Sequence, residues 1–163
     1  MKIIKLNKGY ETIVDDKYFD ILNKRKWFIN YSNGVPRYAA FTFRKNKNNY
    51  CTLMHRMIME LEGYKIKGKQ IDHINGNGLD NRLENLRLAS HSENQRNSKL
   101  RKDNTSGYKG VVWNKRDKVW FALLRIGKKR LNLGSFDNKI DAAKAYNEAA
   151  IKYYGEFANL NEI

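Results

Sequence analysis

Residues 68–97, GKQIDHINGNGLDNRLENLRLASHSENQRN, carry the strongest structural signal in the sequence. Glycine, asparagine and aspartate interrupt two short apolar segments before a polar segment begins near Ser90, which predicts a strand, a loop, a second strand and a helix. Asp72 and His73 end the first predicted strand, and Asn94 follows in the first turns of the predicted helix. We expect these three side chains to converge.

These side chains suit the hydrolysis of a phosphodiester, which needs a water nucleophile, a base, and positive charge near the phosphate. The Asp72 carboxylate and the Asn94 amide offer hard oxygen ligands for a metal, whereas the imidazole of His73, with an ordinary pKa of about 6.5, suits the base. No second His or Cys stands at ligand spacing from His73, which favours Mg2+, or another hard divalent cation such as Mn2+, over zinc. Asn85 is expected to hydrogen-bond the loop backbone and fix the hairpin.

The stretch resembles the HNH homing endonuclease family, in particular its phage-type branch, in three motifs: IDHINGN, LDNRLENLRLAS and SENQRN. The resemblance covers roughly residues 53–97 and implies a ββα-metal (His-Me finger) fold. It implies that Asp72 and Asn94 hold the metal, that His73 is the general base, and that Asn85 is structural. The last signature position carries Asn rather than His, which the phage-type branch also permits.

Two arginines in this stretch, Arg87 and Arg96, are candidates for contacts with the phosphate backbone. They fit equally well on a solvated face. For His55, on the preceding predicted helix, we expect a packing or hydrogen-bonding role. His91, near the start of the polar helix, is expected to be partly exposed.

The residues before the motif predict a β-rich N-terminal extension over 1–52. A hairpin is expected over residues 3–14, followed by a short helix capped by Asp15 and Asp16 and ending at Leu22. A second hairpin turns at Asn33 and Gly34. TLMHRMIMELEG then has apolar residues at helical spacing and opens the nuclease core, residues 53–97.

Residues 98–106, SKLRKDNTS, have little apolar content and are the predicted linker. The following runs YKGVVW, VWFALLRI and KRLNLGSF predict a three-stranded antiparallel sheet. Asp137 is the expected N-cap of a helix that runs to about Tyr154 and covers one face of the sheet. The predicted class is therefore α+β, with this second domain over residues 107–163.

This C-terminal part resembles the APETALA-two domain of plant ethylene-response factors over about residues 106–160. The resemblance implies a sheet that lies in the major groove of double-stranded DNA, with a helix packed behind it. Trp113 is a candidate both for the core and for a DNA contact, and Arg116 lies in a turn that favours phosphate. The remaining expected DNA contacts are Trp120, Arg125, Arg130 and Lys109.

Composition agrees with a polyanionic partner, because Lys+Arg 32 against Asp+Glu 17 gives a formal charge of +15. Residues 1–97 hold 18 basic and 10 acidic side chains, and residues 98–163 hold 14 and 7, so the excess is shared. A lone Cys51 excludes an internal disulfide. No apolar run approaches a membrane span, and the start lacks the apolar core of a signal peptide, so a cytoplasmic protein without a membrane partner is expected.

These features predict a metal-dependent endonuclease that acts on double-stranded DNA as a monomer or homodimer. The family resemblance implies that it is a homing-type HNH enzyme of a phage or bacterial mobile element. The alternative is a DNA-binding regulator with an inactive nuclease fold. An RNA-directed or structure-specific nuclease is a further rival, which a major-groove reader disfavours because A-form RNA hides that groove.

Overall fold

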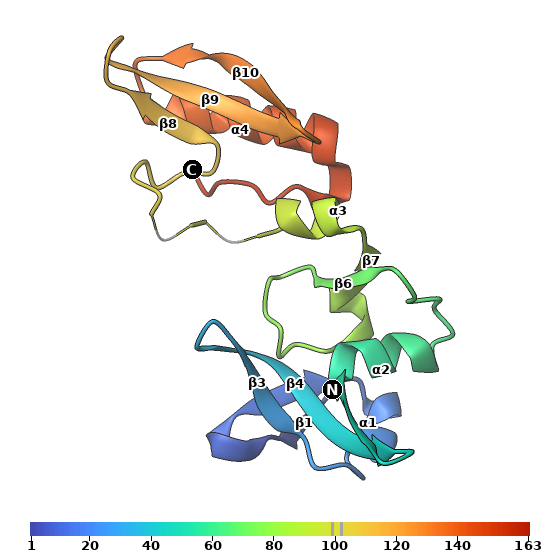
Figure 1. Ribbon diagram of the computed structural model, residues 1–163. Helices are drawn as coiled ribbons and strands as arrows, with labels where there is room; N and C mark the ends of the chain where they lie inside the picture. The colour runs from blue at the N-terminus through green and yellow to red at the C-terminus, as the bar shows by residue number, and fades with distance from the viewer. Residues whose placement is uncertain (99, 102) are drawn as a thin grey trace. The chain divides into compact units, whose positions relative to one another are not determined.

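The computed structural model describes residues 1–98, 100–101 and 103–163, and it divides into two compact units, Met1–His91 and Ser92–Ile163. Figure 1 shows the elements of both units. The division falls before the predicted 98–106 linker, of which Lys99 and Lys102 lie outside the described residues. No helix in the described part of the chain is long and apolar enough to cross a membrane.

The first unit opens with a two-stranded antiparallel sheet and a short helix. Asp15 precedes this helix, as predicted, but its side chain does not cap it. Instead the Asp15 carboxylate accepts a hydrogen bond from the backbone N–H of Leu83, 2.8 Å away, and so ties the helix start to a loop far along the chain. The elements are β1 (Lys2–Lys5), η1 (Asn7–Gly9), β2 (Glu11–Val14) and α1 (Asp16–Leu22).

A three-stranded antiparallel sheet in the order β3-β4-β5 follows. The sequence predicts its first hairpin, which turns at Asn33 and Gly34, but not its third strand. The second turn is made by Asn46 and Lys47, both at positive φ, and it lacks the glycine that signals such a turn. The strands are β3 (Phe28–Ser32), β4 (Val35–Lys45) and β5 (Asn48–Leu53).

Helix α2 (Met54–Leu61) packs onto this sheet with the apolar face that its periodicity predicts. Met54, Ile58 and Met59 are buried and contribute about 1.5–3 kcal/mol each in hydrophobic free energy. They join one core cluster that includes Val14 of β2, Leu22 of α1, and Trp27, which lies between α1 and β3.

The motif stretch forms a hairpin of β6 (Gln70–His73) and β7 (Leu86–Ala89), joined by a long loop that contains η2 (Leu83–Asn85). Asp72 stands opposite Arg87 in the antiparallel register. Helix α3 (His91–Arg96) follows, so the chain has the expected order of strand, loop, strand and helix. The structure confirms a mixed α+β protein with several small antiparallel sheets.

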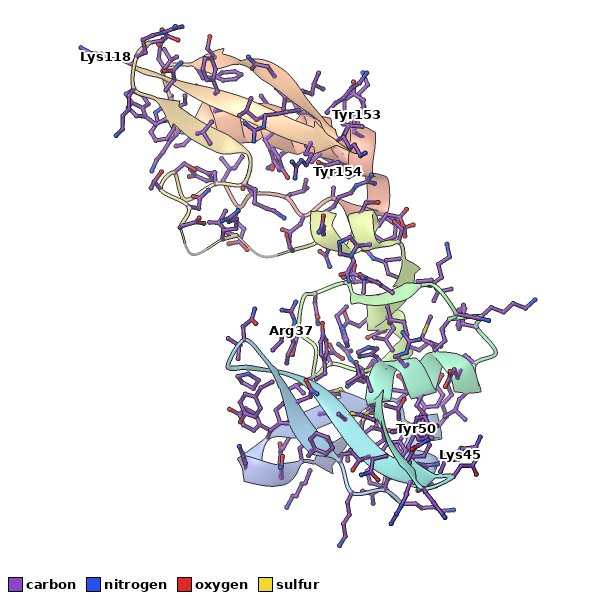
Figure 2. The ribbon with its side chains drawn as sticks, viewed as in Figure 1. Arg37, Lys45, Tyr50, Lys118, Tyr153 and Tyr154 are labelled. Carbon is purple, nitrogen blue, oxygen red and sulfur yellow. The ribbon has the colours of Figure 1, made fainter. Side chains whose placement is uncertain are left out.

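In the second unit, three antiparallel strands are backed by one helix, as predicted. The N-cap is Asn138 rather than Asp137, because the Asn138 side chain accepts a hydrogen bond from the backbone N–H of Ile140 at 2.8 Å. Figure 2 shows Lys118 at the turn between the first two strands. The elements are β8 (Val111–Asn114), β9 (Val119–Ile126), β10 (Lys129–Phe136), α4 (Lys139–Tyr154) and η3 (Gly155–Phe157).

Alanines on α4 allow the helix to lie close against one face of this sheet. Ala142 and Ala143 pack with Val111 and Ala122. Further along the helix, Leu124 of β9 packs with Tyr146, Ala150 and Tyr154. Among the described residues of this unit, no helix covers the opposite face of the sheet.

Candidate functional site

Asp72 and His73 lie side by side at the end of β6, and both are buried. The Asp72 carboxylate accepts two hydrogen bonds from the guanidinium of Arg87, at 2.9 and 2.7 Å. The side chains of this ion pair are only 5% and 12% exposed, respectively. Arg87 therefore neutralises Asp72 across the hairpin, which differs from the exposed phosphate contact expected for it.

The imidazole of His73 lies 3.2 Å, through Nε2, from the side-chain oxygen of Asn81. Its ring also stacks on Tyr38, with centroids 5.8 Å apart, and meets His55 edge-on at 5.0 Å. Burial lowers the pKa of His73, while the hydrogen bond that its ring makes to the Asn81 oxygen and the charge of Asp72 act in the opposite direction. A lowered pKa keeps the imidazole neutral at neutral pH, the form that can accept a proton.

His55 on α2 is a second buried imidazole in this cluster. Burial, followed by the charge of His73 and of Arg56, lowers the pKa of His55 to about 3. Its Nδ1 has no hydrogen-bond partner among the described residues. The packing role expected for His55 is present, since its ring contacts both His73 and Tyr38.

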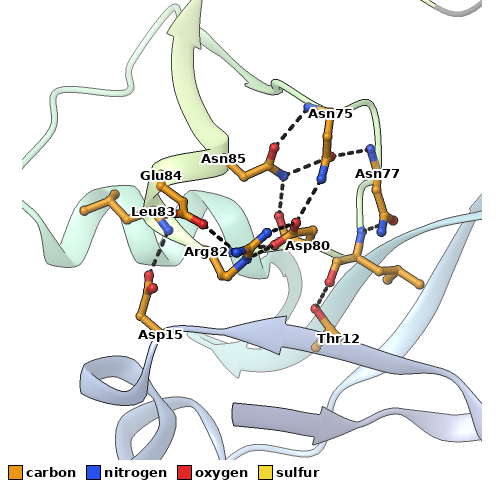
Figure 3. A network of polar contacts seen from close by, with 10 residues as sticks. Thr12, Asp15, Asn75, Asn77, Asp80, Arg82, Leu83, Glu84 and Asn85 are labelled. Atoms are coloured by element: carbon orange, nitrogen blue, oxygen red, sulfur yellow. Dashed lines mark hydrogen bonds and ion pairs between the residues drawn. The ribbon is translucent and has the colours of Figure 1, made fainter. Parts of the chain in front are cut away.

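The loop between β6 and β7 is held by a network of amide and carboxylate side chains (Figure 3). Asn85 accepts a hydrogen bond from the backbone N–H of Asn75 and donates to the side chain of Asn75 and to the carbonyl of Asp80. Arg82 donates to both carboxylate oxygens of Asp80, at 2.8 and 2.7 Å. This hydrogen bonding lowers the pKa of Asp80. The Asn85 side chain therefore hydrogen-bonds backbone groups of the loop, as expected from the sequence.

The N-terminal extension packs closely against the loop between β6 and β7. A Cβ on Gly78 would stand 2.1 Å from the carbonyl oxygen of Arg37 and 2.7 Å from the ring of Tyr38, so only glycine fits there. The guanidinium of Arg37 donates to the Tyr38 hydroxyl at 3.1 Å, and Arg37 is labelled in Figure 2. Strand β4 therefore forms one wall of the site around His73.

Asn94 lies on α3 in the second unit, and its approach to Asp72 stays a prediction. In the described part of the chain, no cluster of three or more His, Cys, Asp or Glu side chains is arranged to hold a metal. The donor chemistry of Asp72 and Asn94 still fits a hard divalent cation, because a carboxylate and an amide supply oxygen ligands and leave positions for water and phosphate oxygens.

In the second unit, the strand register shows on which face of the sheet each expected DNA-contact residue lies. Arg125 and Arg130 are cross-strand partners and exposed. Along β9, Arg125 alternates with the buried Leu124 and Ala122, which face α4. Arg125 and Arg130 therefore lie on the open face, as a DNA-reading role requires.

Trp120 differs from its expected role as a DNA contact. It shares the face of Ala122 and packs against the core beneath α4. Trp113 is its cross-strand partner, with ring centroids 4.9 Å apart, and so lies on the same face, although it is 42% exposed. Both tryptophans therefore belong to the helix side of the sheet rather than to its open face.

Three other basic residues have partners within this unit. The Lys109 ammonium donates to the carbonyls of Arg96 and Ser98, at 2.9 and 2.6 Å, and burial lowers its pKa to about 8. Arg96 lies over the ring of Tyr154, 4.7 Å from its centroid. Arg116 is exposed in the β8–β9 turn and pairs with its neighbour Asp117. Only Arg116 of these three keeps the exposed position expected of a phosphate contact.

Three residues around His73 are absent from the sequence-based set: Thr12, Tyr38 and Asn81. Asn81 lies within the motif stretch, eight residues after His73, where the loop composition marks it only as a turn former. Thr12 and Tyr38 lie in the extension, and nothing local in the sequence connects either with the motif.

Comparisons with known proteins match two separate regions of the chain to two different families. A family model described as HNH endonuclease matches residues 52–96, and one described as AP2 domain matches residues 106–156. An uncharacterized HNH endonuclease, L560, of Acanthamoeba polyphaga mimivirus is 30% identical over 158 residues, which cover 96% of this chain and 77% of that protein. Protein 3.8 of Escherichia phage T7 is 46% identical over 71 residues, or 44% of this chain and 59% of that protein. No solved structure matches significantly.

The HNH match covers the hairpin of β6 and β7, and the AP2 match covers the helix-backed three-stranded sheet of the second unit. The chain belongs to the HNH endonuclease family and carries a C-terminal domain of the AP2 type. These two relatives come from a phage and a giant virus.

Proposed function

We propose that this chain is a metal-dependent, homing-type DNA endonuclease that hydrolyses phosphodiester bonds of double-stranded DNA. The observation that carries the proposal is the buried imidazole of His73, which lies next to the carboxylate of Asp72 at the end of β6. The family resemblance implies products with a 3′-hydroxyl and a 5′-phosphate.

His73 acts as the general base in this proposal. Its imidazole takes a proton from a water molecule, and the hydroxide that results adds to phosphorus. The bond from phosphorus to the 3′ oxygen then breaks, and that oxygen takes a proton from water. General bases of this kind contribute about 10²–10⁴-fold in rate.

Asp72 and Asn94 are the proposed ligands of a hard divalent cation, Mg2+ or Mn2+. When bound, such an ion supplies positive charge to the phosphate and to the leaving oxygen. Asp72 shares its carboxylate with Arg87, so the guanidinium sets the orientation of this ligand. Asn85 holds the loop between the two strands of the hairpin.

The sheet of the second unit is the proposed reader of the DNA sequence. Arg125 and Arg130 stand opposite each other on its open face, where guanidinium groups can contact guanine edges in the major groove. Arg116 is proposed to contact phosphate from the β8–β9 turn. With one Asp72-His73 pair per chain, a monomer is expected to nick, whereas a homodimer would cut both strands.

The test is incubation with supercoiled plasmid and magnesium. The wild-type protein is expected to relax or linearise the plasmid, and His73→Ala and Asp72→Ala are each expected to lose at least about a hundredfold in rate. His91→Ala is the matched control, because it removes an exposed imidazole that has no assigned role. Equal cleavage by all variants, or no cleavage by any, would overturn these assignments.

One observation favours the alternative of a DNA-binding regulator with an inactive nuclease fold. The Arg87 guanidinium occupies the Asp72 oxygen Oδ2, which a metal would compete for. The same assay separates the two functions, since a regulator would bind the plasmid and leave it supercoiled at every magnesium concentration.

A further inference from the structure

A chain of buried polar contacts runs from His73 into the N-terminal extension. Nε2 of His73 lies 3.2 Å from Oδ1 of Asn81, and Nδ2 of Asn81 lies 2.7 Å from Oγ1 of Thr12. Oγ1 of Thr12 in turn lies 2.7 Å from the carbonyl oxygen of Leu79. Thr12 and Asn81 are both 0% exposed, so water does not compete for these contacts.

The direction of each hydrogen bond in this chain follows from the last contact. Two oxygens 2.7 Å apart require a hydrogen between them, and a carbonyl has none to give, so the single hydroxyl proton of Thr12 points at Leu79. The Met54 sulfur, 4.0 Å from the same hydroxyl, is a weak and more distant acceptor. Thr12 can therefore only accept from Asn81.

The orientation of the Asn81 amide is set by this requirement. Its NH2 group must face Thr12, so its carbonyl oxygen faces His73 and can only accept. The Nε2 atom of His73 must then carry a hydrogen. In a neutral imidazole, the other nitrogen, Nδ1, carries the lone pair.

We propose that Asn81, backed by Thr12, is a positioning residue that places the proton of His73 on Nε2 and makes Nδ1 the nitrogen that accepts the proton of the attacking water. The part that concerns catalysis rests on the proposed function of His73 as the general base. Thr12 belongs to β2, so the N-terminal extension takes part in setting the state of the base rather than only supporting the hairpin.

The role of Asn81 is distinct from that of the neighbouring loop asparagine Asn85. Among the described residues, the Asn85 side chain hydrogen-bonds Asn75 and Asp80, which both belong to the loop itself. Asn81 instead connects the imidazole with a hydroxyl that lies 69 positions earlier in the chain. A wrong tautomer at a catalytic histidine keeps the geometry of a site and still removes most of its activity.

The first test reads the tautomer directly in the full-length wild-type protein without metal. The nitrogen-15 shifts and two-bond couplings of the His73 ring distinguish a proton on Nε2 from one on Nδ1, and His73→Ala identifies the signal by its disappearance. The expected result is the Nε2–H tautomer. A predominant Nδ1–H tautomer overturns the proposal, whatever the activity of the protein.

The second test compares Thr12→Val with Thr12→Ser. Valine keeps nearly the shape of threonine but removes the hydroxyl, so the Asn81 amide is free to rotate and to present its NH2 group to Nε2. We expect a mixture of tautomers and a fall in kcat of about tenfold or more, with KM unchanged. Serine keeps the hydroxyl and is expected to retain the wild-type tautomer and kcat.

Equal kcat and equal ring signals in both variants would overturn the role of Thr12. If Thr12→Val does not fold, the tautomer of the wild-type protein still decides the proposal. Failure of the proposed function has a different signature, because His73→Ala would then cleave at the wild-type rate while the tautomer measurement remained unaffected.

Discussion

Replacing His55 should make the first unit more resistant to acid. The pKa of His55 is about 3 in the folded protein, against about 6.5 for an exposed imidazole. As the pH falls below 6.5, the unfolded chain binds a proton that the folded chain does not, so stability is fully present above pH 6.5 and is lost below it. From this one group the loss between pH 7.5 and pH 5 amounts to about 2 kcal/mol.

The measurement is the free energy of unfolding in urea for the wild type, His55→Phe and His55→Leu at several pH values between 7.5 and 5. The two replacements differ in volume and should differ from each other at pH 7.5, since one fills the site and the other leaves a cavity. Both remove the titrating group, so both should gain about 2 kcal/mol on the wild type over this pH range. A constant difference from the wild type at every pH would refute a buried, neutral His55.

Three further predictions concern other contacts. Arg87→Met should lower the free energy of unfolding by about 3–5 kcal/mol, because it leaves the buried Asp72 carboxylate without its counter-ion; urea unfolding measures this, and an unchanged midpoint would contradict it. Gly110→Ala should destabilise the second unit much more than Gly107→Ala. Both glycines have positive φ, but only at Gly110 would the new methyl group stand 2.1 Å from the ring of Tyr146. Hydrogen exchange in β9 measures the difference, and equal effects of the two substitutions would contradict the prediction. Arg125→Ala should weaken specific DNA binding by about 1–3 kcal/mol and leave nonspecific magnesium-dependent cleavage largely in place, so unchanged affinity for the target would remove Arg125 from the reader.

The local elements of this protein are predictable from its sequence because each carries its own signal. The hairpin of β6 and β7 is marked by glycine and asparagine between short apolar runs, and α2 and α4 by apolar residues at helical spacing. Strand β5 was missed because its turn, at Asn46 and Lys47, lacks glycine.

The faces of the second sheet were harder to assign. Strand β9 reads VWFALLRI, an almost continuous apolar run without the alternation that separates a buried face from an open one. Trp120 and Phe121 are equally plausible on either face until the register with β8 and β10 is known. For this reason the sequence does not show that Trp120 packs on the helix side of the sheet.

The environment of His73 depends on contacts between distant parts of the chain. Tyr38 on β4 stacks on the His73 ring, and Thr12 contacts it indirectly through Asn81. Contacts between residues so far apart in the chain produce no periodic pattern in the sequence. The pairing of Asp72 with Arg87 follows from strand register, which the sequence alone does not specify across a long loop. The motif predicts phosphodiester hydrolysis, but the side chains that surround His73 could not be predicted from it.

Whether His73 is the general base is tested most directly by measuring DNA binding and DNA cleavage on the same preparation of His73→Ala. Binding to duplex DNA is read from mobility shifts, and cleavage from magnesium-dependent conversion of supercoiled plasmid. We expect a wild-type Kd together with a cleavage rate lowered by at least about a hundredfold. A variant that binds and cuts like the wild type would contradict His73 as the base and, with it, the proposed mechanism.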